Sequence, residues 1–385
     1  MGFAYAPAVQ AQDACTSGAL ANSLQCGDSS DASGSSGATA IGDNSTASGD
    51  ESTAIGEASL ASGFQSTAVG EEADATAIAA TAVGNDAIAD FVDSTAIGHS
   101  ADVGGIGAVA IGADANAAGV SSTAIGFSAL ASGNEAVALG NASDATASGS
   151  IAIGGDAADA GSLGAQATGI DSIALGADTS AAGQEAAAIG SEAVALGRAS
   201  VALGHATDAS ADYSVAIGHA AIASSDSVVA IGSGTEASGA EATAVGTEAE
   251  ATATDSSAFG NAATAGGVGA TALGNDATAT GTAGTAVGRL AQATASNSTA
   301  LGFSADATDV NSVAVGSNAQ ATTDRASALG SSANASGDLA TSIGSFSAAS
   351  GDFAVTLGSN TTATAIGSTA LGYNSDATAA NATAV

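Results

Sequence analysis

A glycine that recurs every fourteen residues constrains this chain more than any other feature of its sequence. One series of these glycines runs from Gly42 to Gly154, and a second runs from Gly176 to Gly372. The two series hold 9 and 15 glycines, and each of these 24 glycines follows an Ile, Val, Leu or Phe. A fixed period over so many copies is the signature of a solenoid, in which each repeat forms one coil and packs against its neighbours.

The composition taken alone is typical of a disordered chain, so it is the regular placement of the apolar residues that indicates a folded one. Leu, Ile, Val and Phe make up only 63 of the 385 residues, and the net charge is −35, a combination common in unfolded chains. With 38 acidic and three basic residues, the chain is predicted to bind neither nucleic acid nor anionic membranes. It has no apolar run of the roughly 20 residues that a membrane helix needs, so we expect no membrane insertion.

Within each coil, the residues alternate with period two, which is typical of β-strands. We number positions from the repeat glycine, so that −1 precedes it and +1 follows it. The alternation predicts two short strands per coil, one ending at −1 and one spanning +3 to +5, joined by two tight turns. Coils of this kind stack with their strands in parallel. The predicted fold is therefore an all-β parallel β-solenoid with 14-residue coils.

The alternation also predicts which side chains point into the coil. We expect positions −3 and −1 to point inward, because −1 holds the largest apolar side chain of the repeat, and positions +3 and +5 to do the same in the second strand. The predicted core column at −1 contains Ile41, Ile55, Val69, Ile97, Ile125, Leu203, Ile217 and Leu301. Position −2 would then face outward as a candidate trimer-interface stripe, which contains Ala54, Ala68, Ala96, Ala124, Ala216 and Ala300.

The distribution of charge indicates self-association. No acidic residue lies between positions −4 and 0 in any of the 24 coils, so one face of the solenoid carries no carboxylate. One large apolar side chain per coil buries too little surface to offset the entropy of ordering fourteen residues. We therefore expect copies of the chain to associate along the charge-free face by closed rotational symmetry. The alternative is a strip of small residues that faces solvent.

The repeat resembles the head repeats of trimeric autotransporter adhesins of the YadA-like kind. Ser-Thr-Ala-Ile-Gly at 94–98 and 122–126, Ser-Val-Ala-Ile-Gly at 214–218 and Ser-Thr-Ala-Leu-Gly at 298–302 carry the resemblance, which covers about residues 38–385. It implies a left-handed parallel β-roll, a homotrimer about a common axis, and an extracellular position on a bacterial surface. Members also carry a coiled-coil stalk and a β-barrel anchor. Neither is in this sequence, so we expect a fragment that continues into them.

Five segments are expected along the chain. Residues 1–11 end in Val-Gln-Ala and read as the remnant of a signal peptide. A cap at 12–37 holds Cys15 and Cys26, the only two cysteines, and a disulfide between them is favoured in an exported protein. A first block of coils at 38–154 and a second at 176–385 flank a register break at 155–175, which is either a tolerated slip or a surface loop.

Few residues suggest chemistry beyond structure. We predict no enzyme, cofactor or metal cage, because the chain has no Lys and no distinctive nucleophile or carboxylate pair. His205 and His219 both occupy position +1 in neighbouring coils and are expected to stack. They are either exposed turn residues or a pair that binds a metal or senses pH.

Three functions compete. The first is an adhesin head that binds host matrix, surfaces or other cells through many weak contacts. The second is a structural filament or spacer built by end-to-end stacking of solenoids, whose ends carry unpaired strand edges. The third is ice binding, which is disfavoured because the threonine ladder is expected to point inward with Ile55; the ladder contains Thr39, Thr53, Thr67, Thr81 and Thr95.

Overall fold

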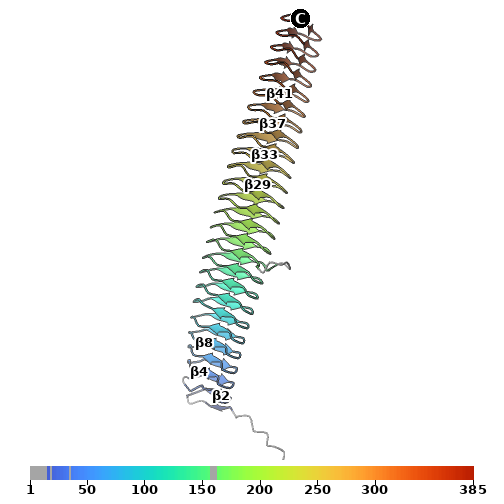
Figure 1. Ribbon diagram of the computed structural model, residues 1–385. Helices are drawn as coiled ribbons and strands as arrows, with labels where there is room; N and C mark the ends of the chain where they lie inside the picture. The colour runs from blue at the N-terminus through green and yellow to red at the C-terminus, as the bar shows by residue number, and fades with distance from the viewer. Residues whose placement is uncertain (1–14, 18–19, 34–35, 157–162) are drawn as a thin grey trace, which may run out of the picture. The chain divides into compact units, whose positions relative to one another are not determined.

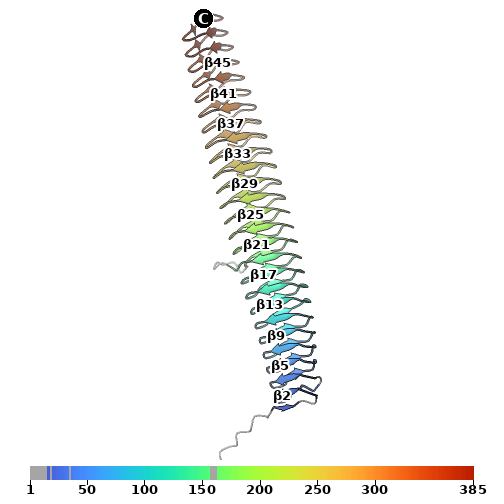
Figure 2. The same cartoon turned by 180° about the vertical axis from the view of Figure 1, so that it is seen from behind.

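The computed structural model describes residues 15–17, 20–33, 36–156 and 163–385. The predicted signal-peptide remnant and the middle of the register break lie outside these ranges. The chain divides into two compact units, residues 1–192 and 193–385, which we describe separately. In both units the regular elements of the described residues are all β-strands, and these residues form no helix able to span a membrane. Coils stack one on the next within each unit (Figures 1 and 2).

The first unit begins with a small cap. Strand β1 (Thr16–Ser17) pairs antiparallel with β2 (Leu24–Cys26), and β2 pairs in parallel with β3 (Thr39–Ile41). The predicted disulfide is present: Cys15 and Cys26 are bonded, with their Cα atoms 4.3 Å apart. Because β2 is bonded to β3 along its other edge, the cap joins the stack of coils as an additional layer.

Each coil of the first unit contributes a three-residue first strand at positions −3 to −1 and a two-residue second strand at +4 to +5. After β3, the first strands are β5 (Thr53–Ile55), β7 (Thr67–Val69), β9 (Thr81–Val83), β11 (Thr95–Ile97), β13 (Val109–Ile111), β15 (Thr123–Ile125), β17 (Val137–Leu139), β19 (Ile151–Ile153), β21 (Ile173–Leu175) and β23 (Ala187–Ile189). The second strands are β4 (Thr46–Ala47), β6 (Leu60–Ala61), β8 (Asp74–Ala75), β10 (Ile88–Ala89), β12 (Asp102–Val103), β14 (Asn116–Ala117), β16 (Leu130–Ala131), β18 (Asp144–Ala145), β20 (Gln166–Ala167) and β22 (Ser180–Ala181).

The second unit repeats this arrangement. Its first strands are β25 (Val201–Leu203), β27 (Val215–Ile217), β29 (Val229–Ile231), β31 (Thr243–Val245), β33 (Ser257–Phe259), β35 (Thr271–Leu273), β37 (Thr285–Val287), β39 (Thr299–Leu301), β41 (Val313–Val315), β43 (Ser327–Leu329), β45 (Thr341–Ile343), β47 (Val355–Leu357), β49 (Thr369–Leu371) and β51 (Thr383–Ala384). Its second strands are β24 (Val194–Ala195), β26 (Asp208–Ala209), β28 (Ile222–Ala223), β30 (Glu236–Ala237), β32 (Glu250–Ala251), β34 (Thr264–Ala265), β36 (Thr278–Ala279), β38 (Gln292–Ala293), β40 (Asp306–Ala307), β42 (Gln320–Ala321), β44 (Asn334–Ala335), β46 (Ala348–Ala349), β48 (Thr362–Ala363) and β50 (Asp376–Ala377).

The strands pair in parallel at the fourteen-residue register that the sequence predicts. First strands bond to first strands, as Thr123 aligns with Val109, and second strands bond to second strands, as Leu130 aligns with Asn116. At the register break, Ile151 of β19 aligns with Ile173 of β21, 22 residues later. Since β18 likewise pairs with β20, neither sheet is interrupted at the register break.

Two left-handed residues per coil make the turns. They occupy positions +2 and +9, as in Glu72 and Ala79, which both have φ of 55°. Outside the last coil the residue after each is buried. In many coils it is a Ser or Thr whose hydroxyl closes the turn: Ser122 Oγ donates to Gly119 O at 2.7 Å and Ser59 Oγ donates to Gly56 O at 3.0 Å. Since these positions lie seven residues apart, a coil consists of two similar halves.

The interior of each unit holds only small side chains. Positions −4, −2, +3 and +5 are buried and carry mainly Ala and Ser, and the largest fully buried side chains are Val103 and Val228. The second strands were predicted correctly, since Ala73 and Ala75 are 0% exposed and Asp74 between them lies on the outer side.

The predicted orientation of the first strands is wrong. The predicted core column lies on the outside, where its members are half-buried or exposed: Ile41, Ile55, Val69, Ile97, Ile125, Leu203, Ile217 and Leu301. The predicted surface stripe lies inside, where its members are 0% exposed: Ala54, Ala68, Ala96, Ala124, Ala216 and Ala300. A coil closed by fourteen residues holds its two strands too near each other for a column of Ile and Leu side chains between them, and an offset of one residue exchanges the two faces of a strand. The threonine ladder is consequently outward as well.

A buried hydroxyl network replaces the alanine column in two coils. Thr356 Oγ1 donates to Ser342 Oγ at 3.1 Å, Ser342 Oγ lies 2.7 Å from Ser347 Oγ, and Ser347 Oγ donates to Gly344 O at 2.8 Å. These three side chains are at most 1% exposed. The two exceptions to alanine at position −2, Ser342 and Thr356, therefore satisfy each other.

We expect Ser342→Ala to lower the free energy of unfolding by about 1–3 kcal/mol, because it leaves the buried Thr356 hydroxyl without its acceptor. Adding Thr356→Val removes that donor while keeping its shape, so the double variant should be less destabilised than the sum of the two single variants. Chemical denaturation of all four proteins measures this difference. Strictly additive losses would show that the two hydroxyls do not act together.

Candidate functional site

The outer face of the first strands, which we call the first-strand face, is the principal apolar surface of both units. It presents positions −3 and −1, a Thr or Val beside an Ile, Leu or Val in most coils. Paired residues form straight ladders, such as Thr95 with Val109 and Ile97 with Ile111. Large side chains on this face are half-buried or exposed, and the exposed ones include Ile97 at 38% in the first unit and Leu301 at 45% in the second.

The first-strand face is also the part of each coil that carries no acid. The absence of acids, from which we predicted an outward alanine stripe, is thus a property of the first strand as expected. The side chains that point outward from this strand, however, are Thr, Val, Ile and Leu rather than Ala. An acid-free ladder of exposed Ile, Leu and Val is a stronger association surface than alanine, because each side chain removes more apolar area from water on contact.

The outer face of the second strands, the second-strand face, carries carboxylates at position +4. Burial raises the pKa of Asp74, Asp102, Asp144 and Asp306, and the nearby Asp90 carboxylate raises the first two further. The Oδ1 atoms of Asp144 and Asp306 are buried without a hydrogen-bond partner. Burial therefore penalises the charged form of these carboxylates relative to that of an exposed Asp.

A second acidic feature lies beside Asp74. Glu72 and Asp86, at position +2 of successive coils, share a hydrogen bond that raises the pKa of Glu72. With Ala58, Asp74 and Ile88 they line a shallow groove. Across the described part of the chain, however, no group of three or more His, Cys, Asp or Glu side chains is placed to hold a metal ion.

We expect the protein to unfold at a higher temperature at pH 4 than at pH 7. A folded-state pKa raised above the unfolded value, which for Asp is about 3.9, gives stability that is fully present below the unfolded pKa and lost as pH rises through the folded pKa. The pKa of Asp31, lowered by the Ser33 hydroxyl, acts in the opposite direction. Calorimetry should show that Asp144→Asn raises the unfolding temperature at pH 7 but not at pH 3.5, whereas the exposed Asp338→Asn changes neither. A wild-type optimum at neutral pH would contradict this account.

The second turn carries an apolar ridge in the first unit, which the sequence reasoning missed. Position +8 is a large apolar residue in five successive coils, and the exposed fractions of these side chains run from 37% to 53%. The apolar ridge contains Phe64, Ile78, Val92, Ile106 and Val120. A comparison of position +8 between the two blocks of coils would have revealed the ridge, because this position is mostly polar in the second unit.

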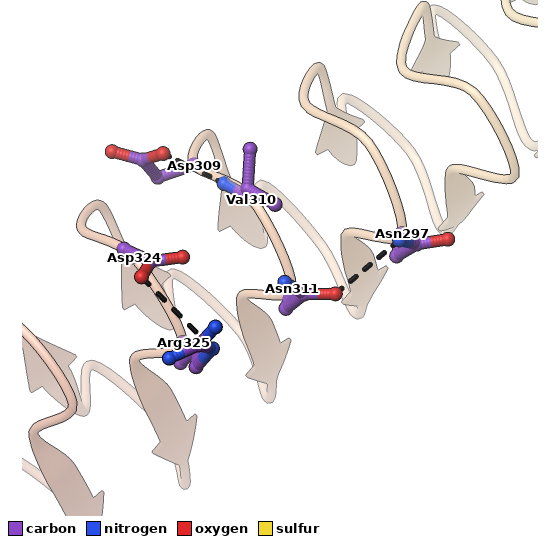
Figure 3. Close-up of polar contacts among 6 residues, drawn as sticks. All are labelled: Asn297, Asp309, Val310, Asn311, Asp324 and Arg325. Carbon is purple, nitrogen blue, oxygen red and sulfur yellow. Dashed lines mark hydrogen bonds and ion pairs between the residues drawn. The ribbon is translucent and has the colours of Figure 1, made fainter.

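Figure 3 shows corresponding turns of the second unit, where position +8 is Val310 in one coil and the acidic Asp324 in the next. Asn297 Nδ2 donates to Asn311 Oδ1 of the next coil at 3.3 Å, and the backbone N–H of Val310 donates to Asp309 Oδ1 at 2.7 Å. Arg325 Nε lies 4.0 Å from Asp324 Oδ2, an exposed pair that contributes little to stability. The apolar ridge is thus a property of the first unit and not of the repeat itself.

The first turn brings together the two histidines that the sequence predicts to stack. The rings of His205 and His219 lie 5.4 Å apart between centroids and only 5° from parallel. In other coils of the same unit, this position holds Arg289 with its guanidinium 5.6 Å from the centre of the Phe303 ring.

Comparison with known proteins identifies the repeat. A family model described as the YadA head domain repeat (2 copies) matches most of the chain from residue 32 onward. Its matches cover residues 32–57, 61–87, 75–101, 104–129, 131–157, 164–179, 181–207, 209–235, 237–263, 265–291, 279–305, 307–333, 335–361 and 363–385. Among solved structures, the crystal structure of the collagen-binding domain of the Yersinia adhesin YadA is 26% identical, covering 45% of this chain and 69% of that chain with a TM-score of 0.23. No curated protein matches the chain.

Proposed function

Because the chain belongs to the family of YadA head domain repeats, we propose that it is the head of a trimeric adhesin. It would stand outside a bacterial cell and attach that cell to extracellular matrix, to surfaces or to other cells. The number of chains and the cell-surface position are carried over from the family. The attachment itself requires no catalytic group, which agrees with an adhesin-type head.

The observation that carries the proposal is the acid-free, apolar first-strand face. Soluble monomers rarely expose a contiguous apolar patch larger than a few hundred Å², whereas here Ile, Leu and Val side chains form a ladder along each unit. Three copies placed with this face toward a common axis would bury all three ladders at once, with identical contacts at each coil. The carboxylates of the second-strand face would then remain in solvent, where a net charge of −35 is tolerated best.

Adhesion would use surfaces that the trimer leaves outside. The apolar ridge is the best candidate, because five large side chains repeat at one-coil spacing and a matrix protein or surface can contact several at once. Many weak contacts made together give strong attachment without any single high-affinity pocket. Collagen belongs in the first panel of ligands, together with fibronectin and an uncoated polystyrene surface.

Two measurements on the purified chain test this function. Sedimentation should give the mass of three chains, and the protein should remain on at least one of the coated or bare surfaces after washing. Ile78→Ser combined with Ile106→Ser should remove most of that attachment. Ile366→Ser is the matched control, since Ile366 occupies the same turn position, is 60% exposed and has no apolar neighbour at +8 in the preceding coil. A monomer that attaches to nothing would refute the proposal.

A second function is favoured by one observation, the outward threonine ladder. Thr39, Thr53 and Thr67 repeat in register on a regular sheet, where evenly spaced hydroxyl and methyl groups can order water as an ice lattice does. A trimer would cover this face, so the two functions exclude each other there. Thermal hysteresis in a solution of monomers would favour ice binding over the adhesin.

A further inference from the structure

We propose that His205 and His219 form a two-imidazole binding site for a divalent transition-metal ion of the Cu²⁺, Ni²⁺ or Zn²⁺ class. The inference is independent of the adhesin function. It rests on the placement of two identical ligand side chains at one edge of the second unit, on adjacent turns of the solenoid.

The backbone holds the two histidines in register. Each follows its repeat glycine, and each precedes an alanine in the left-handed conformation, Ala206 with φ of 53° and Ala220 with φ of 51°. Hydrogen bonds bracket the pair: Gly218 N–H donates to Leu203 O at 2.8 Å and Ala220 N–H donates to His205 O at 3.0 Å. The two Cα–Cβ bonds therefore start from equivalent points on neighbouring coils and point the same way.

The side chains are already close to a chelating arrangement. Both histidines are exposed, and their parallel rings lie 5.4 Å apart between centroids. A metal ion bound by two imidazoles has metal–nitrogen bonds of about 2.0–2.1 Å, so the two nitrogens lie within about 4.2 Å of each other. Tilting the exposed rings toward each other would bring the nitrogens to that separation.

The chemistry of the pair selects the ion. Neutral imidazole nitrogen is a preferred ligand of Cu²⁺, Ni²⁺ and Zn²⁺, whereas Mg²⁺ and Ca²⁺ prefer oxygen. Only two protein ligands meet here, in keeping with the lack of any cluster of three or more ligand side chains among the described residues. Water would complete the coordination, so the site would bind metal reversibly at the surface and would not be a structural cage.

The chain supplies its own control in His99. This histidine occupies position +1 of a coil in the first unit and is exposed like the pair, with its Nδ1 atom 3.2 Å from Ser100 Oγ. The residues at the same position in the adjacent coils are Asn85 and Ala113, so His99 has no imidazole beside it. It shares the turn, the exposure and the acidic surroundings of the fold, but it offers only one imidazole.

The test is a Cu²⁺ titration of the full chain by calorimetry, with electron paramagnetic resonance to count nitrogen ligands. We expect one site per chain with couplings from two imidazoles. His205→Ala and His219→Ala should each weaken this site by roughly tenfold or more, because the second ligand binds an ion already held by the first. His99→Ala should leave it unchanged.

Circular dichroism melts in a chelator should be the same for all four proteins, which separates loss of the site from loss of the fold. Loose binding of copper to the many carboxylates contributes the same background heat in every variant, so the difference between wild type and each variant reports the histidine site alone. If His205→Ala binds copper as wild type does, if His99→Ala weakens binding as much as the pair variants, or if the spectrum shows a single nitrogen, the two-imidazole site is disproved.

Discussion

Replacing Gly274 by alanine should unfold the coils around it, with a loss of stability above about 4 kcal/mol, a range reached only by severe structural conflicts. Gly274 has φ of +142°, where residues with a side chain are strongly disfavoured. An added Cβ would lie 2.5 Å from the carbonyl oxygen of Gly288 and 2.7 Å from its carbonyl carbon. Both atoms belong to the backbone of the next coil, so neither can move without breaking the ladder.

The matched control is Gly269→Ala in the same coil. Gly269 also has a positive φ, +65°, but nothing lies within 4 Å of the Cβ it would gain. Alanine already occupies the left-handed conformation at the same position of the next coil, in Ala283 with φ of 53°. We expect a change within about 1 kcal/mol, since the strain of this conformation is partly offset by the lower entropy of the unfolded chain. Equal denaturation midpoints for the two variants would mean that the close approach of the coils does not determine the glycine period.

Replacing Ile231 by aspartate should dissociate the assembly while each chain stays folded. Ile231 ends β29 on the first-strand face and is 36% exposed in the single chain, between Ile217 and Val245 in the ladder. In a trimer closed around this face, three carboxylates would be buried near one another without partners. A cost of about 4 kcal/mol, typical of an uncompensated buried charge, weakens association about a thousandfold.

Ile222→Asp provides the comparison, because it makes the same chemical change nine residues away. Ile222 is 40% exposed on the second-strand face, between Asp208 and Glu236. There an additional carboxylate adds only local repulsion in solvent, so sedimentation should give the wild-type mass. If Ile222→Asp dissociates the protein and Ile231→Asp does not, the association surface lies on the opposite side of the coil from the one we propose.

Much of this fold is predictable from the repeat alone. The fourteen-residue glycine period predicts parallel coils, two strands per coil and the pairing register, and all of these are confirmed. In the second strand the acids at +4 fix the orientation, because Asp74 cannot be buried between Ala73 and Ala75. The Cys15–Cys26 disulfide was also predictable, since no other cysteine competes.

The orientation of the first strand was not predictable by the same reasoning. In Thr53-Ala54-Ile55 no residue is charged, so the sequence alone does not say which side faces water. The usual preference for burying the largest apolar side chain placed Ile55 inside. The distance between the two strands of a coil overrides that preference, and this distance is a property of the closed coil that no single repeat reveals. The apolar ridge was overlooked for a different reason, because it departs from the average repeat.

The interior of alanine and serine has a consequence for how such a chain can change over generations. Side chains of this size fit one another in any order, and every coil presents the same hydrogen-bonding edges above and below. Recombination between repeats can therefore add or delete whole coils without creating a mismatched junction. The length of the solenoid can therefore evolve one coil at a time, while substitutions at the outward positions can create new contacts.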